Sequence, residues 1–566
     1  MSLFGALNLG SSALNAQQAA LQVTGNNIAN VGNANYSRET ADLAPNGDQQ
    51  IQPGIFMGTG VALQDIQRQV DESLNSRLRS ANSDASSASA SQTWLSQVES
   101  SFNALSTSNI STQMSTFFGD WSTLANSPQS AGQRQVVVSD GANLASSLNQ
   151  ENSQLTTIQT SVQQQIAADV KTANGLAQQL ASLNGQITTS SSGPAGSDNA
   201  LLDQRDSLLT KLSSLMNVNT VIQSDGSANV YVGSTPLVVA TTTSGVGVQT
   251  QTVNGAPTSV VVATSDDGPY TLSSGELGAL QNVQTQVNGV IAQTNTLAHN
   301  IIGAVNALHA SGQGLTGVTS VTGNNAVADA NVALDSTAAR LDFPPTNGSF
   351  VVHVTNTATG LSTSSLVQVN LTGSPNDTTL NSLATSLNAV AGVGAKVVNG
   401  QLTISATNPG STLSFSQDSS SVLAGLGINT IFTGSSAEDI AVNQAVQNNP
   451  SLVAAAQNGD PGDNQTALAI AALNTQAIAS TGGVSLQQSY QNLVDGVSTQ
   501  VANATSQSQA AAAVKDTLTT QQQALSGVSI DEESVNMLTE QRAYQGAAIF
   551  ITTVNSMMTS LLAMIP

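Results

Sequence analysis

Cysteine is absent from this chain, and charged and aromatic residues are scarce. Without cysteine there can be no disulfide, no thiolate nucleophile and no cysteine-ligated metal site. Charged residues fill 8% of the 566 positions, whereas about 25% is usual in globular proteins. Aromatic residues add only 3%, so the cores must be mainly aliphatic and the surface neutral and polar. A chain of this length predicts several domains.

Basic residues are the scarcest charged group, with 12 Lys and Arg against 34 Asp and Glu and a net charge of −22. So few cations disfavour binding to nucleic acid, and an anionic membrane surface would repel the chain. Residues 547–565 are uncharged and almost long enough to span a bilayer. Thr and Ser interrupt them off the apolar side, as in an amphipathic helix. We therefore expect neither nucleic acid nor a membrane as partner.

Signals of secretion and catalysis are also missing. The first basic residue is Arg38, so the N-terminus lacks the basic region of a secretory signal. There is no P-loop, no HExxH zinc motif and no GxSxG motif. His299, His309 and His353 are predicted to be structural, because a metal site needs more converging ligands. We predict a protein that is not an enzyme and has no catalytic residue, cofactor or metal.

Both ends of the chain carry a seven-residue apolar repeat. Near the start, Leu7, Leu14, Leu21 and Ile28 recur every seventh position, and a small or polar residue precedes each. Near the finish, steps of three and four alternate through Tyr544, Ala547, Ile551, Val554, Met558, Leu561 and Ile565. These are the core positions of coiled-coil helices. Since the two helices are almost uncharged all round, both are predicted to contact protein on more than one face.

The interior predicts β-rich segments enclosed by helices. We expect an α+β multidomain fold, in which a long coiled-coil-like helical bundle from both chain ends carries inserted β-rich outer domains. The predicted order is an N-terminal assembly helix and extended segment, a helical core, a β-rich domain, a helical return, an inserted β-rich α/β outer domain and a C-terminal helical core with its terminal assembly helix. Their respective bounds are 1–68, 69–217, 218–275, 276–316, 317–435 and 436–566.

Short motifs carry a resemblance to a known family. The segment Asn26-Asn27-Ile28-Ala29-Asn30 and the following Tyr36-Ser37-Arg38 resemble the N-terminal signature of bacterial flagellar rod, hook and hook-associated proteins. The second motif is closest to that of the hook-associated members. Residues 199–206, 274–278, 306–309, 526–533 and 541–545 resemble further segments of those members. The resemblance therefore extends over essentially the whole chain.

The resemblance implies a structural, extracellular protein of the bacterial flagellum, exported by the flagellar type III apparatus without a cleaved signal peptide. It implies a junction ring between hook and filament, with the chain itself, the hook protein, hook-associated protein 3 and an export chaperone as partners. The predicted assembly interface combines the seam residues with the N-terminal motif: Leu7, Leu14, Leu21, Asn26, Asn27, Ile28, Ala29, Asn30, Tyr544, Ile551, Val554, Met558, Leu561 and Ile565.

Three alternatives remain open from the sequence. A hook or distal-rod subunit shares the N-terminal signature, although the interior motifs favour the hook-associated members. A secreted adhesin displayed on the flagellum would use the lobe at 317–435 to bind a surface ligand. An enzyme carried on a flagellar scaffold is the third, and the absence of a catalytic cluster argues against it.

Overall fold

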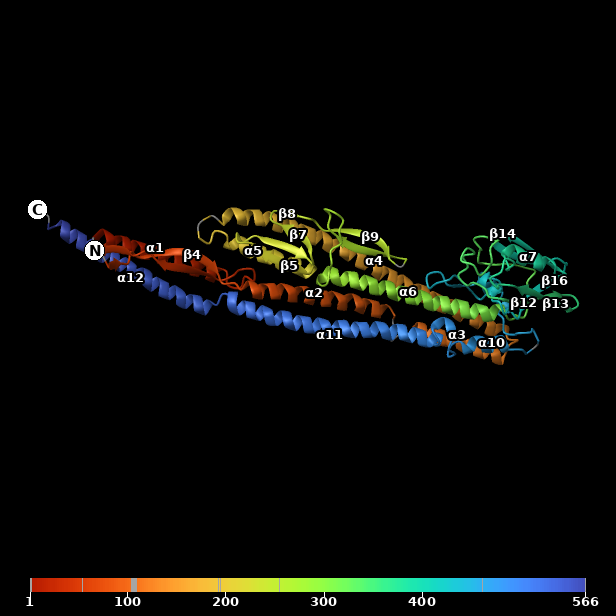
Figure 1. Cartoon of the computed structure of the whole chain (residues 1–566). Helices are drawn as coiled ribbons and strands as arrows, with labels where there is room; N and C mark the ends of the chain where they lie inside the picture. The colour runs from red at the N-terminus through yellow and green to blue at the C-terminus, as the bar shows by residue number, and fades with distance from the viewer. Residues whose placement is uncertain are drawn as a thin grey trace. The chain divides into compact units, whose positions relative to one another are not determined.

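The computed structural model describes residues 3–52, 54–102, 109–191, 193, 195–253, 255–460 and 462–564 (Figure 1). These residues form two compact units, each assembled from distant parts of the chain. Unit 1 comprises residues 1–94, 161–285 and 502–566, and unit 2 comprises residues 95–160 and 286–501. Each unit therefore depends on contacts between segments that lie hundreds of residues apart.

Long helices dominate both units, as the sequence predicts. Their bounds are α1 Leu3–Ala29, α2 Glu72–Ser101, α3 Ile110–Asn126, α4 Ala131–Ser190, α5 Asn199–Leu215, α6 Gly275–Ala310, α7 Leu380–Asn388, α8 Val422–Gly425, α9 Gln444–Asn448, α10 Gln465–Ala472, α11 Leu486–Ser526 and α12 Ile530–Leu562, with short 3-10 turns at Pro450–Leu452 and Ala479–Thr481. No helix among the described residues has the length and apolar character needed to cross a membrane. The last helix begins after Ser529, whose side chain accepts from the Glu532 N–H and so caps the helix.

The strands of unit 1 form small antiparallel sheets. Their bounds are β1 Glu39–Pro45, β2 Gln49–Gln52, β3 Ile55–Met57, β4 Val61–Arg68, β5 Val218–Ile222, β6 Ala228–Val232, β7 Thr235–Val239, β8 Thr242–Thr243, β9 Gly247–Val253 and β10 Ala256–Val262. Strands β5 to β8 pair in sequence order, and β1–β4, β2–β3 and β9–β10 are separate pairs. The β1–β4 ribbon runs from the Glu39–Arg68 pair to the Pro45–Val61 pair.

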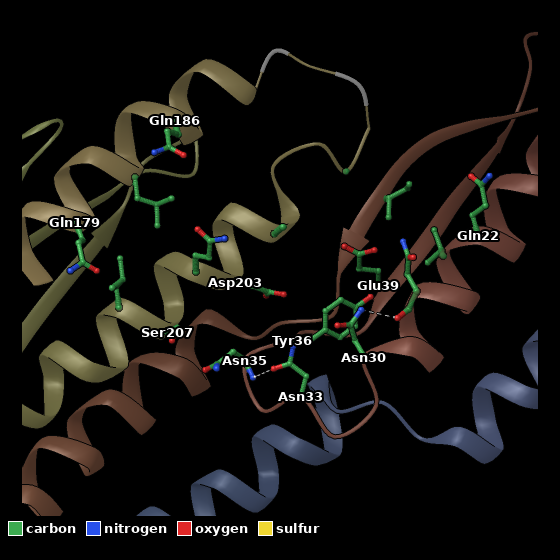
Figure 2. Close-up of a pocket in the computed structure, with 18 of the residues that line it drawn as sticks. Gln22, Asn30, Asn33, Asn35, Tyr36, Glu39, Gln179, Gln186, Asp203 and Ser207 are labelled. Carbon is green, nitrogen blue, oxygen red and sulfur yellow. Dashed lines mark hydrogen bonds between the residues drawn. The ribbon is translucent and has the colours of Figure 1, made fainter.

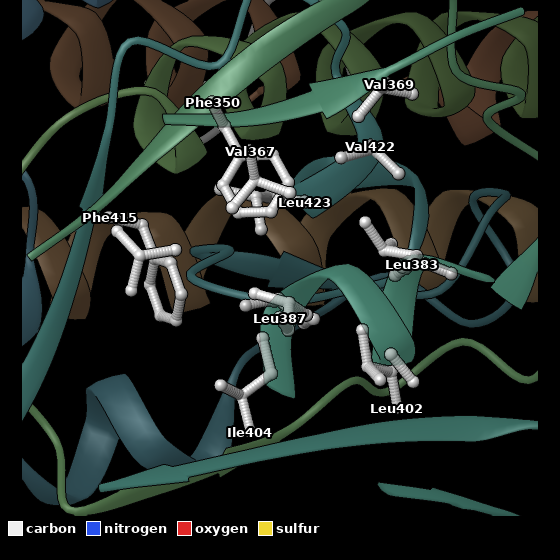
Figure 3. Close-up of a cluster of buried hydrophobic side chains, with 14 of the residues drawn as sticks. Phe350, Val367, Val369, Leu383, Leu387, Leu402, Ile404, Phe415, Val422 and Leu423 are labelled. Atoms are coloured by element: carbon white, nitrogen blue, oxygen red, sulfur yellow. The ribbon is translucent and has the colours of Figure 1, made fainter. Parts of the chain in front are cut away.

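The inserted lobe of unit 2 contains two three-stranded sheets with α7 between them (Figure 3). The strands of the two sheets are β11 Ser320–Thr322, β12 Gly348–Asn356, β13 Ser362–Val369, β14 Val393–Val398, β15 Gln401–Ala406 and β16 Ser411–Ser416, and one short pair outside them is formed by β17 Phe432–Thr433 and β18 Ala441–Val442. Phe350 and Phe415 from one sheet and Ile404 from the other meet Leu383 and Leu387 of α7 in one buried cluster. The lobe therefore has a core of its own.

Helix α6 fixes the chain that returns from this lobe. Asn306 donates to the Phe432 carbonyl and accepts from the N–H groups of Ile431 and Phe432. His309 is fully buried, with Nδ1 against the Asn429 carbonyl at 2.7 Å and Nε2 accepting from the Ala454 N–H at 3.0 Å. Both ring nitrogens of His309 are thus engaged in holding backbone, which is a structural role.

This arrangement predicts a pH dependence for unit 2. Burial, with the Arg134 charge, lowers the pKa of His309 to about 4. An unfolded imidazole titrates near about 6.5. The neutral ring therefore stabilises the fold fully above pH 6.5. That contribution, about 3 kcal/mol, is lost as the pH falls toward 4. Urea unfolding can be followed by the fluorescence of Trp121, whose ring meets His309. Between pH 7 and pH 5 we expect the urea midpoint of the parent protein to fall more than the midpoint of His309→Gln.

The comparison needs a Trp94→Phe background, which leaves Trp121 as the only tryptophan. His309→Gln is needed as the reference because burial also raises the pKa of Glu151, another group of unit 2, to about 8. That group changes stability in the opposite direction over part of the same pH range. Parallel pH profiles for His309→Gln and its parent would contradict the prediction.

Candidate functional site

Helices α1 and α12, from opposite ends of the chain, pack against each other within unit 1 (Figure 1). Apart from Asn536 and Ala548, the buried and half-buried positions of α12 alternate in steps of four and three: Glu533, Met537, Glu540, Tyr544, Ala547, Ile551, Val554 and Met558. This heptad contains the predicted residues from Tyr544 to Met558 and extends three heptad positions further toward the start of the helix, two of which are glutamates. Leu561 is 54% exposed, and Ile565 lies outside the described residues.

The facing side of α1 is made of small and polar residues. Gly10, Thr24 and Asn27 are buried there and lie against Ile551, Glu540 and Glu533 respectively. A Cβ on Gly10 would lie 2.6 Å from Cγ1 of Ile551, so the glycine permits the close approach of the two helices. Each predicted leucine comes directly after a small residue, and successive residues of a helix point about 100° apart. The predicted residues Leu7, Leu14, Leu21 and Ile28 are consequently half-buried on the flank of the contact.

Asn27 is the centre of a buried hydrogen-bond network between α1, β1 and α12. Its Nδ2 donates to the Glu39 carbonyl at 2.8 Å and to Glu533 Oε2 at 2.9 Å. Its Oδ1 accepts from the Tyr36 hydroxyl at 2.8 Å and the Glu39 N–H at 3.0 Å. With both donors and both acceptor sites used, the 1% exposed side chain is fully satisfied. No shorter or purely apolar residue could make these four bonds.

The other members of the same motif are placed differently. Asn26 and Ala29 are exposed, and Asn30 is half-buried, with its amide donating to the Asn26 carbonyl at 3.0 Å. The motif thus contributes one buried contact residue, Asn27, and a polar surface on either side of it. Contact between the exposed members and other subunits stays a prediction.

Two further polar contacts tie α12 to the N-terminal segment. Arg38 pairs with Glu532 at 2.9 Å and with the buried Glu533 at 2.8 Å. The carboxylate of Glu532 therefore pairs with Arg38, and only the backbone N–H of Glu532 takes part in the Ser529 cap. Thr24 donates to Glu540 at 2.7 Å, and burial raises the pKa of that carboxyl. Sequence reasoning missed these pairs, since a glutamate within a helix gives no sign of its distant partner.

A buried ion-pair cluster ties the β1–β4 ribbon to α5. Arg68, whose side chain is 5% exposed, pairs with Asp203 at 2.9 Å and with Asp206 at 2.5 Å. Asp203 also accepts from the Ser37 N–H at 3.1 Å, and Arg205 pairs with Asp206 at 2.7 Å. The fold thus joins the motif at 36–38 to the motif at 199–206, and the Arg38 pairs join it to the motif at 526–533.

Removing the cation from this cluster is expected to weaken unit 1. Arg68→Met should lower its free energy of unfolding by about 3 kcal/mol, because the half-buried Asp203 loses its counter-charge and Asp206 keeps only that of Arg205. Thermal unfolding followed by circular dichroism measures the effect, and Arg77→Met on α2, for which no ion pair is recorded among the described residues, is the control. Equal unfolding temperatures for the two variants would contradict the assignment.

A wide cleft lies beside this cluster, with a volume of about 1040 Å³ (Figure 2). Side chains of α4 and α5 line one side, and those of α1, β1, β4 and the loop after α1 line the other. Burial is the main cause that raises the pKa of Tyr36, Glu39 and Asp203 at its edge. The same three residues take part in the hydrogen bonds and ion pairs already described, which gives them a structural role at this place.

Family comparisons match three parts of the chain. The model of the flagellar hook-associated protein FlgK helical domain matches residues 95–326. The model of the flagellar basal body rod FlgEFG protein C-terminal matches residues 521–564, and that of the flagella basal body rod protein matches residues 7–36. The two terminal matches cover most of α1 and α12, the helices that pack together.

Whole-chain comparisons agree. Flagellar hook-associated protein 1 of Escherichia coli is 26% identical over 579 residues, covering 98% of this chain and 99% of that protein. Its Salmonella typhimurium counterpart is 27% identical over 587 residues, with 98% and 99% covered. The structure of the flagellar hook junction protein FlgK from Burkholderia pseudomallei is 20% identical, covers 80% of this chain and 100% of its own, and superimposes with a TM-score of 0.52.

The paired terminal helices and these matches define a structural protein of the flagellar rod, hook and hook-associated class. Within that class the chain is similar to flagellar hook-associated protein 1 over nearly its whole length. This confirms the resemblance seen in the sequence motifs and the predicted α+β architecture with long helices at both ends.

Proposed function

We propose that this protein is a structural subunit that forms the junction ring between the hook and the filament. Its terminal helices, already paired within one copy, would pack side by side with those of neighbouring copies as an inner coiled-coil layer. The hook protein would lie on one side of the ring and hook-associated protein 3 on the other. The segment at 317–435 would be an outer domain, and the other domain bounds given above belong to the same proposal.

The observation that carries the proposal is an apolar stripe on the side of α12 opposite α1. Its members are exposed: Val535, Leu538, Ile549, Phe550, Met557, Leu561 and Met564. At about 100° per residue they fall within roughly 140° of one another, centred on the face turned away from the α1 contact. Thr539, Arg542, Thr553 and Ser560 are exposed within the same arc, so the stripe consists of a short apolar pair at 535 and 538 and a longer apolar group from 549 to 564. Exposed apolar groups of this kind on a helix mark a place for protein contact.

The half-buried leucines of α1 extend the same argument. Leu7, Leu14 and Leu21 leave part of their side chains uncovered within one copy. Covering such a side chain contributes up to about 1.5–3 kcal/mol, so repeated packing around a ring would stabilise the assembly strongly. Before assembly the terminal helices would be marginal in isolation. We therefore propose that an export chaperone holds them and that the chain leaves the cell by the flagellar type III route without a cleaved signal peptide.

Electron microscopy of cells lacking this protein tests the proposal. We expect hooks without filaments, together with unpolymerised flagellin in the medium, and restoration of filaments by the wild-type gene. Filaments of normal number and length in the deletion strain would overturn the junction role. If those cells instead lost attachment to a surface, the adhesin alternative would take its place.

A further inference from the structure

The β2–β3 hairpin has no partner strand within its own copy. Its two strands pair only with each other among the described residues. Phe56 is 61% exposed, and Gln49 and Gln50 are exposed beside it. A lone two-stranded hairpin is marginally stable in water, and an exposed aromatic side chain at such a place gains from being covered.

The cleft beside the ion-pair cluster carries several exposed amide side chains that can bind a partner. Gln22, Asn26, Gln179, Gln186 and Gln204 line it, and no hydrogen bond of their side-chain amides is recorded among the described residues. Each amide carries donors and an acceptor. Their arrangement on both walls suits a polar chain that presents N–H and C=O groups, such as an extended backbone or another amide.

The floor of the cleft is apolar. Val23 and Leu183 are buried in it, and Leu63, Ile66 and Leu208 are half-buried. An apolar centre with a polar rim is the usual composition of a protein–protein interface. The volume of about 1040 Å³ is large enough to admit an aromatic side chain together with the backbone around it.

The hairpin of the same copy starts beside a different part of α1 from the cleft. Its base at Gly60 lies against the first half of α1, where a Cβ would be 3.5 Å from Cδ1 of Leu9. The α1 residues that line the cleft begin at Ala19, ten positions further along the helix and therefore about 15 Å away at 1.5 Å per residue. On β4 the lining reaches Leu63, two residues from Val61, so a cross-link within one copy is an outcome that the test must separate.

We propose that the β2–β3 hairpin of one copy docks into this cleft of the neighbouring copy, with Phe56 on the apolar floor and the hairpin glutamines against the cleft amides. Residues 49–57 contain no charged side chain, so docking places no charge against Glu39 or Asp203. Two different surfaces meeting head to tail make a heterologous contact, the kind that closes a ring. The inference rests on the proposed ring and specifies one contact within it.

Disulfide trapping tests the contact cleanly, since the chain has no cysteine of its own. Phe56→Cys and Gln204→Cys would be produced together in cells lacking the wild-type protein, and their flagella oxidised and run on a non-reducing gel. We expect a cross-linked dimer only when both variants are present. Gln178→Cys is the matched control, because Gln178 is exposed on α4 but does not line the cleft; its yield should be at least tenfold lower.

The outcomes separate this contact from the ring itself. Flagella that assemble normally but give equal yields with Gln178→Cys and Gln204→Cys, or none with either, overturn the docking and leave the junction role intact. A chain carrying both cysteines that cross-links only within itself also overturns it. Filaments in the deletion strain would instead remove the junction role on which the inference rests.

A second variant keeps the test independent of cysteine chemistry. Phe56→Asp alters only an exposed side chain, so we expect circular dichroism of the purified chain to be unchanged and filaments per cell to fall at least tenfold. Leu361→Asp, at a 74% exposed leucine of the lobe, should leave the number of filaments at the wild-type level. Wild-type filament numbers with Phe56→Asp would overturn the proposal.

Discussion

Replacement of Asn27 by alanine is expected to abolish filament formation. The change removes four hydrogen bonds and leaves the buried carboxylate of Glu533 without the Asn27 donor. Unsatisfied buried groups cost about 1–3 kcal/mol each, and more when charged. The pairing of α1 with α12 should therefore weaken by about 3–5 kcal/mol, which is comparable to a large core truncation.

Filaments per cell and swarming on soft agar measure this effect. Asn26→Ala is the matched control, because Asn26 is the neighbouring residue of the same type and is exposed. We expect the control to swarm at nearly the wild-type rate. If Asn27→Ala and Asn26→Ala behaved alike, the buried network would not be what holds the terminal helices together.

Replacement of Ile549 by aspartate is expected to prevent incorporation into the flagellum without unfolding the chain. Ile549 is 66% exposed within one copy, so the purified variant should keep its helical content and unfolding temperature. In the proposed ring the same position is covered by a neighbour, and burying an unpaired carboxylate there is costly. We expect at least a tenfold loss of filaments, with flagellin released into the medium.

The control adds the same charge elsewhere on α12. Asn555→Asp lies about 120° round the helix from Ile549 at about 100° per residue, at an exposed position outside the apolar stripe. It should assemble normally. Normal filaments with Ile549→Asp would show that the stripe is not covered in the assembled structure.

The sequence was sufficient for the elements whose pattern is local. The half-buried positions from Tyr544 to Met558 follow the apolar repeat of the sequence, because that repeat depends on residues within a few turns. The Ser529 cap of α12 and the turn at Asn399-Gly400, with positive φ at both residues, are equally local features. The resemblance to the family also followed from short motifs, since each motif lies within a single element.

What the sequence by itself determined, then, is the position of the long helices, the heptad of α12 and the resemblance to the family. Only the tertiary structure decided which residues of α1 meet α12: Gly10, Thr24 and Asn27 face it, whereas the predicted leucines are half-buried. Close packing of two helices selects small side chains, whereas periodicity singles out large ones. It also decided that Glu533 is buried, because its partners Asn27 and Arg38 lie about 500 residues away and a carboxylate is buried only where distant groups meet it.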